Sequence, residues 1–394
     1  WYDIGVWFTL FEKCMLDATL AALIARIHSS NRKAVLEFAG AGSLGLAWLH
    51  AVAGSSRTLL EATDRYSTPS MVALLGHMPA RFVARETAEA MAERAYRRAM
   101  TLSDGEPGCF GIACTATIAT DRVKKGDHGC WVVIRDSRSV SAYGLVIAKG
   151  MRDRYGEEAL VSRLLVRAIG LATGAGELEL DFLPDESVDL VVTHADDPFA
   201  RLLAGDVHTV AITPDGEACA DLPWTGGILS GSFNPLHAGH ELLAQAASVA
   251  IGRPVAFELP VVNADKPPLG FAELEQRLVQ LRGRHTILLS RAPRYVDKAA
   301  LYPGCTFVLG HDTAARLLDP RFYDGPQGVQ AALQTIRDHG CRFIVAGRER
   351  DGVFRTLADL IIPAGFEDLF SALPERIFRS DLSSSAIRAT MSGV

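Results

Sequence analysis

One ten-residue segment, GSFNPLHAGH at 231–240, constrains the fold of this chain most strongly. An apolar run at 227–230 precedes it and an apolar helical pattern at 238–251 follows, so it is predicted to join a buried strand to a helix. A glycine permits the tight turn at which open α/β sheets bind ligands, and the helix start offers unpaired N–H groups. His237 and His240, three residues apart, can both donate to phosphate oxygens. The segment therefore predicts a site for a nucleoside triphosphate.

The rest of this half alternates between strand-like and helix-like patterns. They fall at 255–262, 271–282, 286–289, 306–309, 327–338 and 343–346. Such alternation predicts a parallel, doubly wound, Rossmann-like sheet.

The ten-residue segment resembles the H-x-G-H signature of the nucleotidylyltransferase superfamily, within the longer pattern G-x-F-x-P-x-H-x-G-H. Its six fixed positions arise by chance with odds on the order of 10⁻⁵. The resemblance implies transfer of an AMP or CMP unit from a nucleoside triphosphate to a phosphate, with release of pyrophosphate. It gives His237 and His240 catalytic roles, and it assigns nucleotide binding to Gly231, Ser232, Phe233 and Gly239.

Further matches extend this resemblance over about residues 226–392. The segment 380–388 resembles the family's I-S-S-T-x-I-R element, which implies nucleotide contacts from Ser383, Ser384 and Ser385 and a catalytic role for Arg388. Residues 309–312 resemble the G-x-D step of nicotinate- and nicotinamide-mononucleotide adenylyltransferases, and 265–268 resemble their Pro-Pro-His-Lys-like loop. These matches imply substrate contacts from Asp312 and Lys266. Gly347, after the strand at 343–346, would lie near adenine and ribose.

The substrates implied are ATP and a pyridine mononucleotide. Mg²⁺ would be held largely by the phosphates of ATP, so no protein metal site is expected. A cytidylyltransferase, a phosphopantetheine-type adenylyltransferase, a silent structural subunit and a nucleotide sensor remain alternatives.

The first half predicts an α/β layer of mixed sheet and flanking helices. Helical patterns lie at 16–27, 43–52, 84–100 and 156–172, and strand-like runs lie at 34–36, 109–118, 130–135 and 139–148. Residues 13–173 resemble the CinA carboxyl-terminal domain, the nicotinamide-mononucleotide amidase family, in the order of Glu37 before a glycine-rich turn, Gly54-Ser55-Ser56, Tyr66 and Cys114-Thr115.

The residues that carry amidase chemistry in that family are replaced. Its E-S-x-T-G-G element reads 37–42 EFAGAG, with Phe38 where the family has its nucleophilic serine. Its Y-x-N-x-x-K element keeps Tyr66 but has Met71 in place of the lysine. Ser43 could be a nucleophile at a shifted position, but a serine at the start of a helix is more typical of a cap. The resemblance therefore implies a pseudo-amidase that binds a nucleotide, stabilises the second half or mediates assembly.

The chain of 394 residues predicts two or three domains. We expect a CinA-like domain at 13–173, a connecting segment or subdomain at 174–224, and a nucleotidylyltransferase domain at 225–394.

Composition narrows the partners and the compartment. A net charge of −6 gives no basic field for nucleic acid, and no apolar run is long enough for a membrane span. Seven scattered cysteines favour a soluble protein of a reducing compartment, either cytoplasm or an organelle matrix. The aromatic opening without Met favours the cut edge of a longer chain, or a packing segment, over a signal peptide. CinA-like domains commonly self-associate, so a homo-oligomer or a place in a larger complex is compatible with the sequence.

Overall fold

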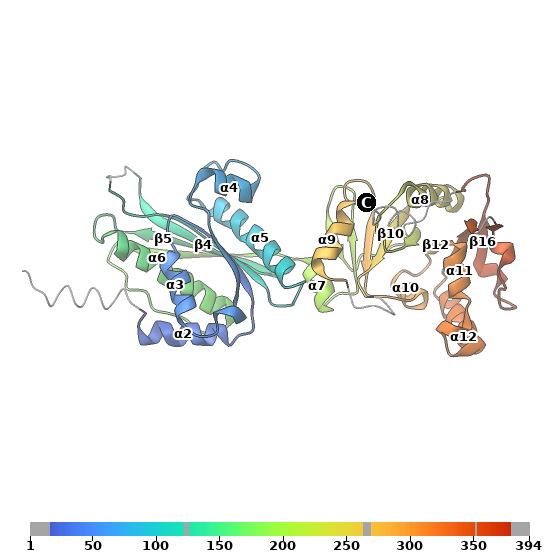
Figure 1. Ribbon diagram of the computed structural model, residues 1–394, viewed down its shortest axis with the longest axis horizontal. Helices are drawn as coiled ribbons and strands as arrows, with labels where there is room; N and C mark the ends of the chain where they lie inside the picture. The colour runs from blue at the N-terminus through green and yellow to red at the C-terminus, as the bar shows by residue number, and fades with distance from the viewer. Residues whose placement is uncertain (1–15, 122–125, 263–268, 351–352, 380–394) are drawn as a thin grey trace, which may run out of the picture. The chain divides into compact units, whose positions relative to one another are not determined.

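The computed structural model describes residues 16–121, 126–262, 269–350 and 353–379. The chain divides into two compact units, Trp1–Asp197 and Pro198–Val394, each built around its own sheet (Figure 1).

In the described part of the first unit, six strands form one sheet in the order β2-β1-β3-β4-β5-β6. β1 is parallel to both β2 and β3, whereas β3, β4, β5 and β6 are successively antiparallel. The strands are β1 (Ala34–Ala39), β2 (Leu59–Asp64), β3 (Phe110–Thr117), β4 (His128–Arg135), β5 (Ser139–Ile147) and β6 (Ser187–His194), and the helices are α2 (Ala18–His28), α3 (Ser43–Ala51), α4 (Thr68–Leu75), α5 (Arg85–Leu102) and α6 (Arg154–Thr173).

Both faces of this sheet are covered by helices, which follows from alternation along the strands. On β3, Ile112 and Cys114 belong to the core beneath α2, α3 and α6, whereas Ala113 belongs to the core beneath α4 and α5. Gly111 permits α5 to pack directly on β3, because a Cβ there would lie 2.2 Å from both the Ala92 carbonyl oxygen and the Tyr96 nitrogen. The sequence-predicted helix at 84–100 is α5.

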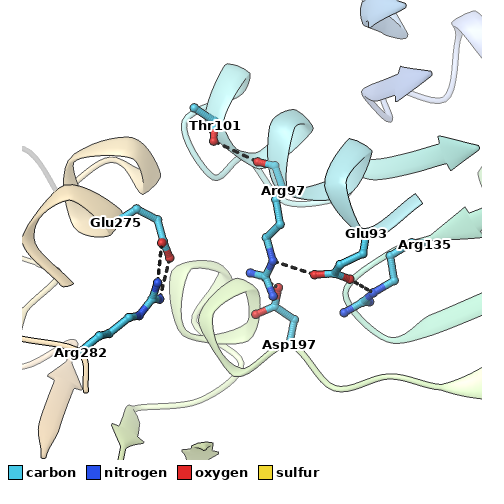
Figure 2. A network of polar contacts seen from close by, with 7 residues as sticks. All are labelled: Glu93, Arg97, Thr101, Arg135, Asp197, Glu275 and Arg282. Carbon is cyan, nitrogen blue, oxygen red and sulfur yellow. Dashed lines mark hydrogen bonds and ion pairs between the residues drawn. The ribbon is translucent and has the colours of Figure 1, made fainter. Parts of the chain in front are cut away.

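A charged network ties α5 to β4 and to the end of the first unit. Figure 2 shows Arg97 of α5 between Glu93 and Asp197, at 2.9 and 3.1 Å, with Arg135 of β4 on the second oxygen of Glu93 at 2.8 Å. Asp197 is almost fully buried, so its carboxylate needs the Arg97 charge. The pair Glu275 and Arg282, also drawn, belongs to the second unit.

In the described part of the second unit, eight strands form a sheet in the order β16-β13-β12-β9-β10-β11-β7-β8. The six strands from β16 to β11 are parallel, and β7 and β8 add antiparallel at one edge. The strands are β7 (Thr209–Ile212), β8 (Ala218–Ala220), β9 (Gly227–Ser230), β10 (Val255–Pro260), β11 (Ile287–Ser290), β12 (Thr306–Gly310), β13 (Arg342–Ala346) and β16 (Phe370–Leu373). A small hairpin pairs β14 (Arg348–Arg350) with β15 (Val353–Arg355). The helices are α7 (Pro198–Ala204), α8 (Ala238–Ile251), α9 (Phe271–Val279), α10 (Tyr295–Leu301), α11 (His311–Leu317) and α12 (Gly325–Asp338).

The parallel strands wind in two directions from the middle of the sheet. The chain passes from β9 through β10 to β11 on one side, and from β12 through β13 to β16 on the other. Neighbouring residues of β9 face opposite cores: Leu229 packs with α8 and α9, and Ile228 packs with α10, α11 and α12. The predicted α/β class and the doubly wound second sheet are therefore confirmed. The junction between β9 and β12 is the switch point at which such sheets bind ligands.

The segment 174–224, for which the sequence suggested a connecting segment or subdomain, is divided between the units. β6 lies within it and extends the first sheet by pairing with β5, and β7 and β8 lie within it and extend the second sheet. β6 forms the edge of the first sheet and none of its side chains is fully buried, so its sequence pattern is weak.

Candidate functional site

Three neighbouring parallel strands of the second unit end at the switch point and carry most of the described candidate residues. β9 leads into the segment 231–237, β12 ends at Gly310 just before Asp312, and β13 ends at Ala346 just before Gly347. Parallel strands present their carboxyl ends at one edge, so these segments gather there.

A buried aromatic ring shapes the turn after β9. Phe233 has a φ of 45°, unusual for a bulky residue, and its ring is 2% exposed. The ring packs edge-on against His240 at 5.2 Å and against Phe257 of β10 at 5.3 Å between centroids. A Cβ on Gly231 would lie 2.9 Å from this ring, so the position requires glycine. The Phe233 ring therefore fixes the relative positions of Gly231 and His240 by packing against both.

The amide of Gln280 holds the same turn from the end of α9, and sequence reasoning missed it. Its Oε1 accepts from the Leu236 N–H at 2.8 Å, and its Nε2 donates to the Phe233 carbonyl at 3.3 Å. Gln280 lies more than forty residues from its partners, so no local pattern could have indicated it.

His237 and His240 are brought together as predicted. His237 is the residue before α8 and His240 lies in its first turn, and their rings stack at 3.7 Å with 22° between planes. The His237 backbone N–H donates to His240 Nδ1 at 3.4 Å. Because Nδ1 accepts, a neutral His240 ring carries its proton on Nε2, which is then a donor. Within the described residues, His237 Nδ1 has no hydrogen-bond partner.

Both imidazoles are held in the neutral form. Burial, the neighbouring His237 ring and Arg348 lower the pKa of His240 to about 4, and Glu241 offsets only part of this. Burial and Arg348 likewise lower the pKa of His237. At neutral pH the pair therefore presents N–H donors, and Arg348 supplies a positive charge beside it.

Arg348 is a further residue that sequence reasoning missed, although it directly follows the predicted Gly347. Its Nε lies 3.6 Å from the Asp312 carboxylate, which links the ends of β12 and β13. Gly347 faces the Phe354 ring of β15, where a Cβ would lie 2.6 Å away. His311, beside Asp312, is buried, and among the described residues neither of its ring nitrogens has a hydrogen-bond partner.

The remaining predicted residues vary in their placement. Ser232 is exposed and Gly239 is buried in the first turn of α8. Lys266, Ser383, Ser384, Ser385 and Arg388 lie outside the described residues. Across the described ranges, no group of three or more His, Cys, Asp or Glu side chains is arranged to hold a metal ion. No helix in those ranges is long and apolar enough to cross a membrane.

The first unit has a similar strand, glycine turn and helix, but its own carboxylate occupies the start of the helix. Glu158 Oε1 accepts from the backbone N–H groups of Gly42 and Leu44 at 2.9 and 3.1 Å, and from the hydroxyls of Ser43 and Ser162 at 3.1 and 3.2 Å. These four hydrogen bonds place the Glu158 carboxylate on the N–H groups at the start of α3 and engage the Ser43 hydroxyl.

The residues at the positions compared with the amidase family are two buried apolar side chains, an exposed tyrosine and a glutamate in an ion pair. Phe38 is buried in the core and Met71 is buried beneath α5. Tyr66 is 71% exposed. Glu37 is buried and paired with Arg65 at 2.7 Å.

Comparisons with known proteins find similarity to part of the chain. No family model matches it, and no curated protein matches it. Three solved structures of bacterial proteins, one described as competence/damage-inducible and two as members of the CinA superfamily, are similar over about two fifths of the chain. CihA, a competence/damage-inducible protein from Agrobacterium tumefaciens, is 17% identical with a TM-score of 0.33, over 41% of this chain and 98% of its own. A CinA-superfamily protein from Escherichia coli is 16% identical with a TM-score of 0.33, over 40% and 90%. One from Enterobacter cloacae is 15% identical with a TM-score of 0.32, over 39% and 89%.

Proposed function

We propose that the second unit transfers an adenylyl group from Mg·ATP to nicotinamide or nicotinate mononucleotide, giving a dinucleotide and pyrophosphate. The observation that carries this proposal is the stacked pair His237 and His240 at the start of α8, at the switch point of a doubly wound sheet. The H-x-G-H resemblance supplies the reaction class.

The reaction needs positioning and charge stabilisation more than a side-chain nucleophile. An oxygen of the acceptor phosphate attacks the α-phosphorus of ATP and forms a new P–O bond. The bond from that phosphorus to the α,β-bridging oxygen breaks, and pyrophosphate leaves with the electron pair. The N–H groups at the start of α8 and the Nε2–H of His240 donate to phosphate oxygens, and Arg348 adds a positive charge nearby. Arg388 and the serines 383–385 are proposed to complete the triphosphate site, with the magnesium ion entering on ATP.

The acceptor is proposed to lie beyond the ends of β12 and β10. Asp312, next to the end of β12, accepts hydrogen bonds, as ribose hydroxyls require. Lys266 is proposed to bind the acceptor phosphate. Both assignments rest on the resemblance to pyridine-mononucleotide adenylyltransferases.

For the first unit we propose a CinA-like domain without amide hydrolysis. Phe38 and Met71 replace the nucleophile and its activating lysine, and Glu158 already holds the N–H groups at the start of α3. This supports a structural or assembly role, with a homo-oligomer or a larger complex as the setting.

The direct test is pyrophosphate release by the full chain with Mg·ATP and each mononucleotide. His240→Gln should lower release at least a hundredfold, because it removes the imidazole from the site. His339→Gln is the matched control, since this histidine of the same unit lies at the end of α12, and it should leave release unchanged. Release with one acceptor names the substrate, and release only with CTP or a pantetheine acceptor reassigns it.

Nucleotide-binding measurements distinguish the transferase from a sensing or structural subunit. Nucleotide binding without pyrophosphate release from any acceptor would favour a sensing subunit. A folded chain that binds no nucleotide would favour a structural subunit and contradict the proposal.

A further inference from the structure

A buried charged cluster lies beneath the turn after β9, and the proposed reaction does not use it. We call Ser230, Glu258, Ser290 and Lys298 the buried lysine cluster. Glu258 on β10 and Lys298 on α10 are 0% and 2% exposed. Fully buried lysine and glutamate side chains are rare in proteins, so their placement calls for a physical reason.

The cluster satisfies both oxygens of the Glu258 carboxylate. Oε1 accepts from the Ser290 hydroxyl at 2.6 Å, and Oε2 accepts from the Ser230 hydroxyl and from Lys298 Nζ. Lys298 Nζ also donates to Ser230 Oγ at 2.8 Å. Lys298 and Glu258 thus neutralise each other, and the two serines attach the pair to the ends of β9 and β11.

The buried lysine cluster is connected to the proposed phosphate-binding turn because Ser230 and Gly231 are consecutive residues. Ser230 is the last residue of β9 and the next residue is Gly231. The Gly231 N–H donates to the Glu258 backbone carbonyl at 3.0 Å. Glu258 therefore holds Gly231 through a backbone hydrogen bond and Ser230 through a side-chain hydrogen bond.

Stability alone explains the cluster poorly. Removing two charges from water costs several kcal/mol per ion, and apolar residues of similar volume are often as stable or more so. What an apolar pair could not supply is a directional hold on the Ser230 hydroxyl, and through it on Gly231.

We propose that Lys298 and Glu258 are positioning residues, which orient the segment from Ser230 to Gly231 so that the turn meets the triphosphate in its reactive geometry. This inference rests on the proposed transferase function. Neither charge contacts the phosphates; both act through Ser230 and the Gly231 backbone.

Two serines provide a matched pair of variants. Ser230→Ala and Ser290→Ala each remove one hydroxyl that donates to the Glu258 carboxylate. Each hydroxyl also accepts one further hydrogen bond, from Lys298 Nζ at Ser230 and from the Ala292 N–H at Ser290, so each variant loses a donated and an accepted bond. Only Ser230 adjoins Gly231. Positioning predicts that Ser230→Ala lowers kcat at least tenfold with KM for ATP changed less than threefold, whereas Ser290→Ala lowers kcat less than twofold.

A double variant separates positioning from folding. Glu258→Leu combined with Lys298→Met should melt within a few degrees of the wild type, because no buried charge is left unpaired. Its kcat should still fall at least tenfold. Lys298→Met alone should melt lower than the double variant, since it leaves Glu258 buried without a cation.

The outcomes distinguish this inference from the proposed function. If the wild type is active and the two serine variants lose kcat equally, or the double variant keeps wild-type kcat, positioning is wrong while the function stands. If the wild type binds Mg·ATP without turnover, the proposed reaction is wrong and the positioning inference, which concerns kcat, falls with it. If the wild type neither binds nor turns over nucleotides, both proposals are overturned.

Discussion

The protonation state of His240 is the sharpest electrostatic prediction for this site. The pKa of His240 falls from 6.5 to about 4, because burial penalises the charged ring and His237 and Arg348 repel it. At pH 7 about one ring in a thousand is then charged, against about a quarter for an ordinary histidine. We therefore expect the neutral Nε2–H of His240 to donate a hydrogen bond to a bound phosphate.

The matching assay is a proton–carbon NMR titration of the histidine rings from pH 3.5 to 8, with His240→Gln to assign the signal. We expect a midpoint near 4 in the free protein. Added ATP should move the midpoint upward, because a phosphate oxygen accepting from Nε2 stabilises the charged ring. A midpoint of 6 or above in the free protein would show that the ring is not held neutral and would refute the reasoning.

The same pKa predicts how stability depends on pH. The unfolded chain keeps a value near 6.5, so between pH 6.5 and about 4 it binds more protons than the folded unit. The contribution of His240 is present above pH 6.5 and is lost as pH falls towards 4. At about 1.4 kcal/mol per pH unit the gap corresponds to about 3 kcal/mol. Solvent around the half-buried ring reduces this to about 2 kcal/mol. The measurement is urea unfolding followed by NMR signals from strands β9 to β13. Between pH 6.5 and 4 the wild type should lose about this much more free energy of unfolding than His240→Gln does.

Three further changes test other parts of the structure. Gly231→Ala would place a Cβ 2.9 Å from the Phe233 ring, so we expect at least tenfold slower turnover and about 1–3 kcal/mol less stability, measured by pyrophosphate release and urea unfolding. Arg348→Met should raise the pKa of both His237 and His240 in the NMR titration, because a repelling cation is removed; an unchanged midpoint would contradict this. Glu158→Ala should cost the first unit about 1–2 kcal/mol in thermal unfolding by removing the cap of α3, with turnover unchanged; a fall in turnover would show that the first unit takes part.

Much of the fold could be predicted from the sequence, because its central strands are buried on both faces. The strands at 227–230 and 306–310 have buried apolar centres, Ile228-Leu229 and Phe307-Val308-Leu309, with glycine at their ends, which is typical of parallel strands. β2 was missed because its sequence, LLEATD, is only partly apolar and only partly buried. α10 was missed because seven residues give too little helical periodicity.

The spacing of the site residues could be predicted, but their electrostatics could not. Two histidines three residues apart at a helix start must lie close, whatever surrounds them. Whether they are charged depends on their burial, to which the Phe233 ring contributes at His240, and on Arg348 of β14. The sequence interpretation gave the imidazoles a role in charge stabilisation, and their lowered pKa values make them neutral N–H donors at neutral pH.

The two units use the same local element in opposite ways, and only tertiary contacts reveal it. Each has a strand, a glycine-containing turn and a helix whose first N–H groups attract an anion. In the first unit Glu158, more than a hundred residues along the chain, supplies that anion, so the helix start is already satisfied. In the second unit the imidazoles and the Arg348 cation lie by the helix start, and the first-turn carboxylate of Glu241 is paired with Arg284 and His285. Among the described residues His237 Nδ1 has no hydrogen-bond partner. An external phosphate would therefore compete with an internal carboxylate in the first unit and with water in the second, which is why the second is the unit we expect to bind nucleotide.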